Sequence, residues 1–91
     1  MAMSGQTTVT TAGTEVILNA DQACNAVLIK AITANTGIMY VGNDGANAVS
    51  STTGYPLSSG EAPIVLEVKN LNQIYVDASV NGEKVAWIVL S

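Results

Sequence analysis

The sequence predicts an all-β protein, a small antiparallel β-sandwich of about seven short strands with Greek-key or jelly-roll-like connections. Short apolar runs recur at intervals of roughly ten residues, and turn residues separate them. No apolar period typical of a helix extends over more than one turn. A long loop between the early and the late runs suits a Greek-key connection. We therefore expect one sandwich domain over residues 8–91, preceded by a flexible N-terminal arm over residues 1–7.

Four candidate strands precede the long loop. They are short β-favouring runs at residues 8–11, 14–18, 26–33 and 38–41. The polar segment 19–24 is expected to turn, with at most one helical turn capped by Asn19 or Asp21. Asn35-Thr36-Gly37 separates the last two runs, and Asn and Gly accept positive φ cheaply. The simplest expectation is a hairpin that pairs these two strands.

The run at residues 26–33 is apolar on both faces. By the two-residue period of a strand, one face carries Val27, Ile29 and Ala31, and the other carries Leu28, Lys30 and Ile32. An antiparallel strand with one face in water alternates more cleanly than this. The strand should therefore be central, or its outer face should be covered.

A long loop is expected at residues 45–61. Three further candidate strands follow it, and they cover residues 63–68, 73–78 and 84–90. In the second of these, Ile74 and Val76 are expected to face the core, and Tyr75 and Asp77 to face solvent. Asn81-Gly82 is a strong hairpin signal and predicts that the last two strands pair. The last run is again apolar on both faces, with Val85, Trp87 and Val89 sharing one of them.

Charge is scarce in this chain of 91 residues, which has three lysines, seven acidic residues, no arginine and no histidine. The net charge of −4 argues against nucleic acid, which requires clusters of Lys and Arg. No apolar run approaches the roughly 20 residues of a membrane span, so no membrane partner is expected. A weakly charged surface with two-faced apolar strands should be covered by other protein. We expect a homo-oligomer, with a trimer favoured.

Catalytic chemistry is hard to build without a histidine base or an arginine clamp, so no catalytic residue and no cofactor is predicted. Glu67 and Asp77 could form a carboxylate pair if their strands are neighbours, but two separate solvated acids are the favoured interpretation. Residues 43–47 (NDGAN) space oxygen atoms as calcium loops do, yet the terminal glutamate is missing. A plain turn is favoured there, and no metal site is predicted. The single Cys24 is expected to be a buried structural thiol.

Candidate partner contacts come from the arm, the long loop and an outward aromatic. A loop as long as residues 45–61 is uncommon in a small domain and usually binds something. Tyr55 and Leu57 should fix it either to the core or to a neighbouring subunit, and Tyr75 is an aromatic of the kind that anchors interfaces. The full set of candidate contacts is Ser4, Gln6, Thr8, Thr10, Tyr55, Leu57 and Tyr75. A sugar-binding platform built from the aromatics is less favoured, because they are spread over four segments.

The order of turns and strands resembles one found in small structural proteins of tailed bacteriophages. The matching residues are Leu28-Ile29-Lys30-Ala31, Asn35-Thr36-Gly37, Tyr40-Val41-Gly42, Gly54-Tyr55-Pro56-Leu57 with Gly60-Glu61, and Leu71-Asn72-Gln73-Ile74-Tyr75-Val76. The resemblance covers residues 26–90 and includes no catalytic residue. It implies a virion part.

The virion part that we favour is a capsid decoration or cement protein. Such a protein is made in the host cytoplasm, sits on the capsid surface and bridges neighbouring subunits of the major capsid protein. The alternative is a head-fibre, neck or tail structural or adhesion module that binds a host glycan. A small hydrolase or a metal-dependent enzyme is disfavoured by the missing histidine and arginine.

Overall fold

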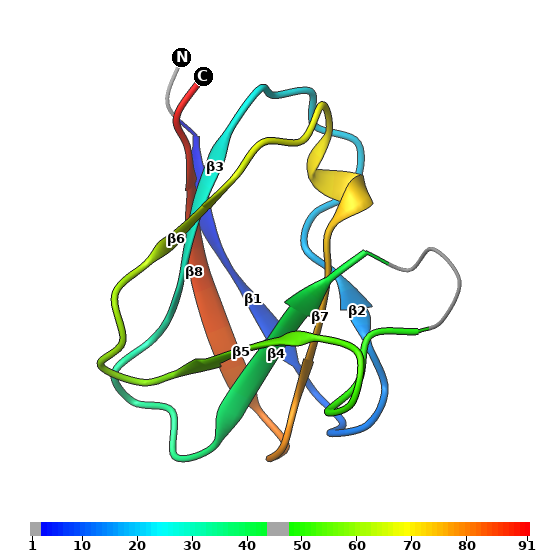
Figure 1. Cartoon of the computed structure of the whole chain (residues 1–91), viewed down its shortest axis with the longest axis vertical. Coiled ribbons are helices and arrows are strands. Elements are labelled where there is room, and N and C mark those ends of the chain that lie inside the picture. The colour runs from blue at the N-terminus through cyan, green and yellow to red at the C-terminus, as the bar shows by residue number, and fades with distance from the viewer. Residues whose placement is uncertain (1–2, 44–47) are drawn as a thin grey trace.

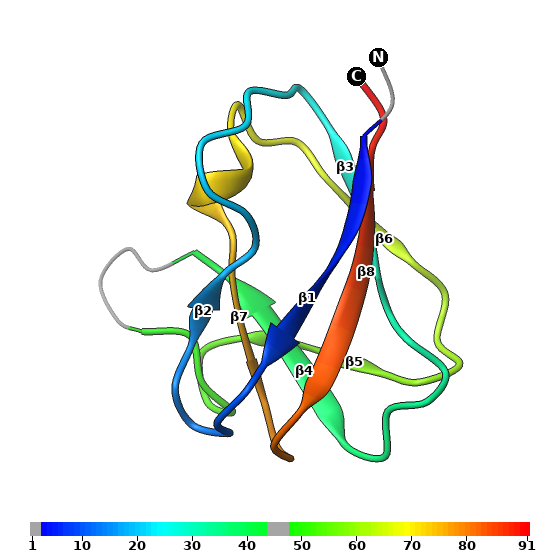
Figure 2. The ribbon, with the colours of Figure 1, turned by 180° about the vertical axis from the view of Figure 1, so that it is seen from behind.

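Two four-stranded antiparallel sheets pack face to face in the computed structural model, which describes residues 3–43 and 48–91 (Figures 1 and 2). Sheet I has the strand order β1-β8-β3-β6, and sheet II has the order β2-β7-β4-β5. The only helical element in these residues is one 3-10 turn, η1 (Leu71–Gln73). The strands are β1 (Ser4–Val9), β2 (Val16–Ile17), β3 (Val27–Ala31), β4 (Ile38–Gly42), β5 (Tyr55–Ser58), β6 (Ile64–Leu66), β7 (Tyr75–Ala78) and β8 (Glu83–Val89).

The all-β sandwich prediction is confirmed, with eight described strands rather than about seven. The added strand is β5, which lies inside the segment expected to be a loop. The strand pairs are nested along the chain: β4 pairs with β5, β3 with β6, β2 with β7 and β1 with β8. The Greek-key or jelly-roll-like wrapping stays a prediction, and this nesting is the observation that supports it.

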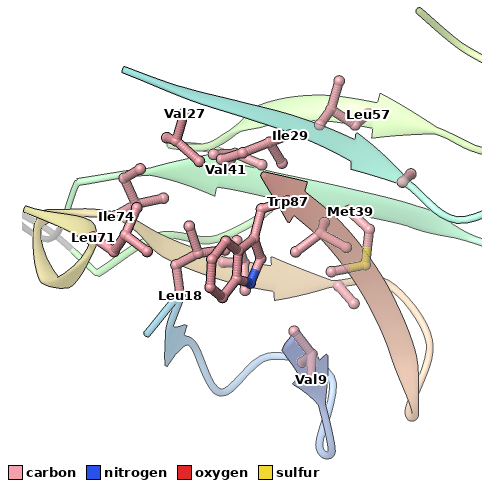
Figure 3. Close-up of a cluster of buried hydrophobic side chains, with 14 of the residues drawn as sticks. Val9, Leu18, Val27, Ile29, Met39, Val41, Leu57, Leu71, Ile74 and Trp87 are labelled. Atoms are coloured by element: carbon pink, nitrogen blue, oxygen red, sulfur yellow. The ribbon is translucent and has the colours of Figure 1, made fainter. Parts of the chain in front are cut away.

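The core lies between the sheets and is built by strict alternation along the central strands. In β3 and β8 the buried residues are those expected to share a face, namely Val27, Ile29, Ala31, Val85, Trp87 and Val89. Figure 3 shows Val27, Ile29 and Trp87 among the apolar side chains gathered between the sheets. Leu71 of η1 is fully buried in the same cluster, because the capping box of Asn70 and Gln73 fixes the turn that presents it. Burying each large aliphatic side chain contributes about 1.5–3 kcal/mol.

The hairpin expected between residues 26–33 and 38–41 is wrong, because β3 and β4 belong to different sheets. The amide group of Asn35 is buried and continues the ladder of β3 with β8. Its Nδ2 donates to the Lys84 carbonyl at 2.7 Å, and its Oδ1 accepts from the Lys84 N–H at 3.0 Å. The buried Glu83 carboxylate then accepts from the N–H groups of Thr36 and Gly37. These bonds hold the chain as a crossover to sheet II.

The hairpin expected at Asn81-Gly82 is also wrong, since β7 and β8 lie in different sheets. A two-residue type I′ turn needs positive φ at both central residues, and only Gly82 has it, at 81°. The Asn81 side chain accepts from the Ala12 N–H at 2.8 Å, and Gly82 N–H donates to the Val9 carbonyl at 2.8 Å. The two residues therefore bind the loop after β1 and leave β7 free to pair elsewhere.

The flexible arm expected over residues 1–7 is not what the structure shows for residues 3–7. Ser4–Val9 forms β1 and pairs with β8 along its whole length, and the Val89 N–H donates to the Met3 carbonyl at 2.7 Å. The inward residues of β1 are small, because the Trp87 ring packs against the backbone at Gly5. The Thr7 hydroxyl accepts from Trp87 Nε1 at 3.1 Å and donates to the Leu18 carbonyl. A strand with such small, polar inward residues shows no apolar pattern in the sequence.

Candidate interaction surface

The outward residues of sheet I form one continuous surface, which we call face I. They alternate with the buried residues of each strand, and they are Ser4, Gln6 and Thr8 of β1, Lys84, Ala86 and Ile88 of β8, Leu28 and Lys30 of β3, and Val65 of β6. The strand register places them in rows that run across the sheet. Face I is therefore an ordered array in which the pairing fixes the neighbours of each residue.

One row of face I is apolar over three strands. Ile88 lies beside Leu28, and Leu28 lies beside Val65. Ile88 is 37% exposed and Val65 is 53% exposed, although both occupy regular strand positions. Leu28 and Ile88, together with Pro63, line a shallow depression of about 220 Å³ beside this row. An apolar row of this kind on a sheet is typical of a protein contact.

Face I carries two positive charges. Lys30 lies directly opposite Ala86, and Lys84 is two residues from Ala86 on the same side of β8. Both lysines are half-buried. The Lys30 ammonium donates to the backbone carbonyl of Glu61 at 3.0 Å. None of the nine residues that define face I is acidic, whereas the chain as a whole has a net charge of −4.

The outer side of sheet II is covered in part by the chain itself, although Ile17 and Ile38 remain 36% exposed. Residues 48–54 fold back over it, with Val49 buried and its N–H donating to Glu15 Oε1 at 2.7 Å. A Cβ on Gly54 would lie 2.6 Å from the Cβ of Tyr40, so the loop touches β4 directly. Face I has no such cover from the described residues. The two outer sides of the sandwich are therefore unequal.

Asp77 is a correction to the sequence prediction, because it is buried with 2% of its surface exposed rather than facing solvent. Its Oδ1 accepts from the Gly13 N–H at 2.9 Å and from the Ala78 N–H at 2.8 Å. Glu67 follows β6 in sheet I, whereas Asp77 lies in β7 of sheet II. The two residues are thus not on neighbouring strands, and the carboxylate pair considered from the sequence does not form across a sheet. Asp77 instead holds the loop after β1.

The structure brings three of the seven candidate contacts together on face I, namely Ser4, Gln6 and Thr8. Thr10 is exposed just beyond the end of β1. Leu57 is only 3% exposed and pairs with Met39 in the core, so it fixes its segment to the core and offers no partner contact. Tyr75 is half-buried on β7. The apolar row was not among the sequence predictions. The signal that could have revealed it is the second apolar face of the runs at residues 26–33 and 84–90.

Tyr55 lies beside face I, at a groove between the edges of the two sheets that Val65 of face I also lines. Its side chain is 58% exposed. The groove has a volume of about 390 Å³, and its apolar lining includes Val41, Ile64 and Leu66. Gln73 lines the rim together with Asn43, whose Nδ2 donates to the Gln73 carbonyl at 2.6 Å. This groove is the second concave surface to which a partner could bind.

Cys24 is buried, as predicted. Its Sγ donates to the Val68 carbonyl at 3.2 Å. Burial raises the pKa of the thiol, and the nearby Lys69 charge offsets this only in part. The neutral thiol is therefore the form that prevails at neutral pH, which is poor for a nucleophile.

Among the described residues, no group of three or more His, Cys, Asp or Glu side chains is placed to hold a metal ion. The NDGAN segment considered for calcium lies, apart from Asn43, outside those residues. In the same part of the chain, no helix is long and apolar enough to cross a membrane. Comparisons with protein-family models, with curated proteins and with solved structures found no match. Face I is therefore the feature of the structure that bears most directly on function.

Proposed function

We propose that this protein is a non-enzymatic structural protein of a bacteriophage virion, a capsid decoration or cement protein. The observation that carries the proposal is face I, a partly apolar sheet surface that the described chain leaves uncovered. The resemblance of the turn-and-strand order to small structural proteins of tailed phages supplies the class of assembly. The major capsid protein is the proposed partner, and the capsid surface is the proposed location.

The proposed mechanism is mechanical. Face I contacts neighbouring capsid subunits and raises the free energy needed to separate them. If the protein binds the assembled, expanded lattice and not the unexpanded one, this binding stabilises the expanded lattice by mass action. A trimer would engage several subunits at once, and linked contacts of this kind raise avidity by about 10²–10⁴ over one site. Charged residues make up only 11% of the chain, which fits a protein whose surface is partly covered by other protein.

The second candidate function is a head-fibre, neck or tail adhesion module, and the exposed Tyr55 at the apolar groove favours it. Aromatic side chains beside a groove can stack on the apolar faces of sugars. Replacing Tyr55 with Ala separates the two candidates, because it should abolish glycan binding but leave attachment to capsids intact.

The test is sedimentation of the purified chain, alone and mixed with empty expanded heads of the phage that encodes it. The expected result is a trimer in the unmixed sample and co-sedimentation with heads at a fixed ratio to the major capsid protein. Unexpanded heads serve as the control and should bind far less. A monomer that stays in the supernatant at all head concentrations would refute the proposal.

A further inference from the structure

We infer that face I docks on a protein surface that is apolar at its centre and presents carboxylates opposite Lys30 and Lys84. This inference rests on the proposed function for the identity of the partner, and it adds the chemistry of the contact. The observations that carry it are the positions of the two lysines, their local partners and the apolar row beside them.

The two lysines are diagonal neighbours on adjacent strands. Because Lys30 lies opposite Ala86, Lys84 occupies the diagonal position on β8. Diagonal Cα atoms across an antiparallel pair lie about 7–8 Å apart, well within the reach of long side chains. Two positive charges at neighbouring positions repel each other weakly in water, and an anion placed between them would be attracted to both.

The described chain does not supply that anion. The Lys30 ammonium bonds a neutral carbonyl, and neither ammonium forms an ion pair with a described residue. The neighbouring Glu83 points inward and is occupied by the N–H groups of Thr36 and Gly37. The Glu61 carboxylate accepts from the Ser58 N–H at 2.6 Å. A carboxylate on whatever covers face I would therefore form an ion pair that neither lysine makes within the described chain.

The same arrangement disfavours face I of a second copy as the occupant. A symmetric contact centred on the two lysines would bring them against the lysines of the copy, and the outward Glu67 lies two residues beyond Val65, toward the opposite end of the sheet. Placing like charges together opposes association. A polyanion such as nucleic acid would neutralise the lysines but would leave the row of Ile88, Leu28 and Val65 without apolar cover. A protein surface with an apolar centre and acidic groups at its edge satisfies both parts of face I.

In such a contact the lysines determine how the two surfaces align. Charges at the edge of an interface mainly set specificity and the rate of association, while the apolar row supplies most of the affinity. The two lysines lie on the same side of the row, Lys30 near the end of β3 and Lys84 near the start of β8, and would orient the docked chain on its partner.

The experiment compares head binding by the native chain and by three variants. In Lys30→Glu/Lys84→Glu both charges are reversed, and in Lys30→Gln/Lys84→Gln both are removed. Lys69→Glu is the matched control, because Lys69 lies outside face I and its ammonium bonds the Asn25 side chain at 3.3 Å. Thermal melts of each variant verify that it folds.

We expect charge reversal to weaken binding by about tenfold or more and charge removal to weaken it by about two- to fivefold. The Lys69→Glu variant should bind within about twofold of the native chain. Carbodiimide, which joins an amine directly to a carboxylate, should link Lys30 or Lys84 to an Asp or Glu of the major capsid protein. Binding of the native chain should also weaken as salt is raised from about 0.05 to 0.5 M.

The outcomes separate this inference from the proposed function. If the native chain does not bind heads, the proposed function fails, and the partner inferred here fails with it. If the native chain binds and the charge-reversed variant binds equally well, the capsid role stands and the carboxylate partner is refuted. Equal losses for the face I variant and for Lys69→Glu would also refute it, since the charge effect would then be unspecific.

Discussion

Gly5 shows how a single absent side chain decides where β1 can lie. A Cβ at this position would be 2.7 Å from the Trp87 ring, which is closer than such atoms pack. The indole can therefore rest on the backbone of β1 while its Nε1 reaches the Thr7 hydroxyl. The closure of sheet I thus depends on a residue without a side chain.

Replacing Gly5 with Ala should destabilise the protein by about 1–3 kcal/mol, because the Trp87 ring must move in a packed core. Chemical denaturation followed by tryptophan fluorescence measures this change. Gln6→Ala is the control, since Gln6 is outward on the same strand and should change the free energy of unfolding by less than about 0.5 kcal/mol. Equal effects of the two changes would show that the contact with Trp87 is unimportant.

Asn35 acts as a substitute for a strand residue, because its one amide group satisfies both backbone groups of Lys84. Asn35→Ala should cost about 1–3 kcal/mol, since it leaves the Lys84 N–H without its partner and the Lys84 carbonyl with only the 3.4 Å bond from the Ile32 N–H. Asn35→Asp keeps the acceptor but buries a negative charge that faces the Lys84 carbonyl, so it should cost at least as much as Ala at neutral pH. Urea unfolding of both variants provides the measurement, and a cost below about 0.5 kcal/mol for Ala would contradict this role.

Cys24 should react slowly with iodoacetamide, because only the thiolate is nucleophilic and burial raises the thiol pKa above its ordinary value of 9.0. Raising the pKa lowers the thiolate fraction at any pH below it, so the folded rate at pH 8 should lie well below the rate in denaturant. The rate should increase as the pH rises through and above 9. A folded rate at pH 8 equal to that of the denatured chain would show that the thiol is accessible and unperturbed.

At the scale of strands, the position of an element was easier to predict than its partner. The faces of β3 and β8 follow from alternation, and Val27, Ile29, Val85 and Trp87 are buried as expected. Their pairing with each other could not be predicted, because it joins residues far apart in the chain. Two local turn signals favoured hairpins instead, and both were overridden by side chains that bond across the fold.

Two elements were missed or misplaced for the same physical reason. β1 presents Gly5 and Thr7 to the interior, so it lacks an apolar pattern, and its place in the fold follows from a tryptophan eighty residues away. β5 begins with Tyr55-Pro56 in a stretch rich in turn residues. Proline is tolerated there because β5 is an edge strand of sheet II. The candidate surface was predicted only as a surplus of apolar faces, since its rows depend on which strands pair.

Deleting residues 1–7 tests the role of β1, because it removes Ser4–Thr7 of that strand. A dispensable arm would leave the melting temperature unchanged. From the pairing with β8 and the cover over Trp87, we expect a fall of more than about 10 °C or loss of cooperative unfolding. Deleting residues 1–2 alone is the control, and differential scanning calorimetry measures both.

For the molecule as a whole, the unequal outer sides of the sandwich are the property that bears on function. Residues 48–54 cover part of sheet II, whereas face I stays open and holds two of the three lysines. A change on face I should therefore affect assembly much more than folding.

Val65→Ser should weaken binding to expanded heads by about tenfold or more, because it interrupts the apolar row. The free energy of unfolding should change by less than about 1 kcal/mol, since the side chain is already 53% exposed. Val80→Ser is the matched control: Val80 is 41% exposed but lies outside face I, and binding should persist. Equal binding by the two variants would exclude the apolar row from the contact.

The position of β8 also has a consequence for how the protein is made. It is the last strand along the chain, yet it lies between β1 and β3 in sheet I (Figure 2). Until Glu83–Val89 has been synthesised, β1 and β3 have no shared neighbour, and the register of Ser4 with Ile88 cannot form. Folds dominated by such distant pairings fold slowly, in milliseconds to seconds. Sheet I can therefore close only after Glu83–Val89 has been synthesised and has left the ribosome.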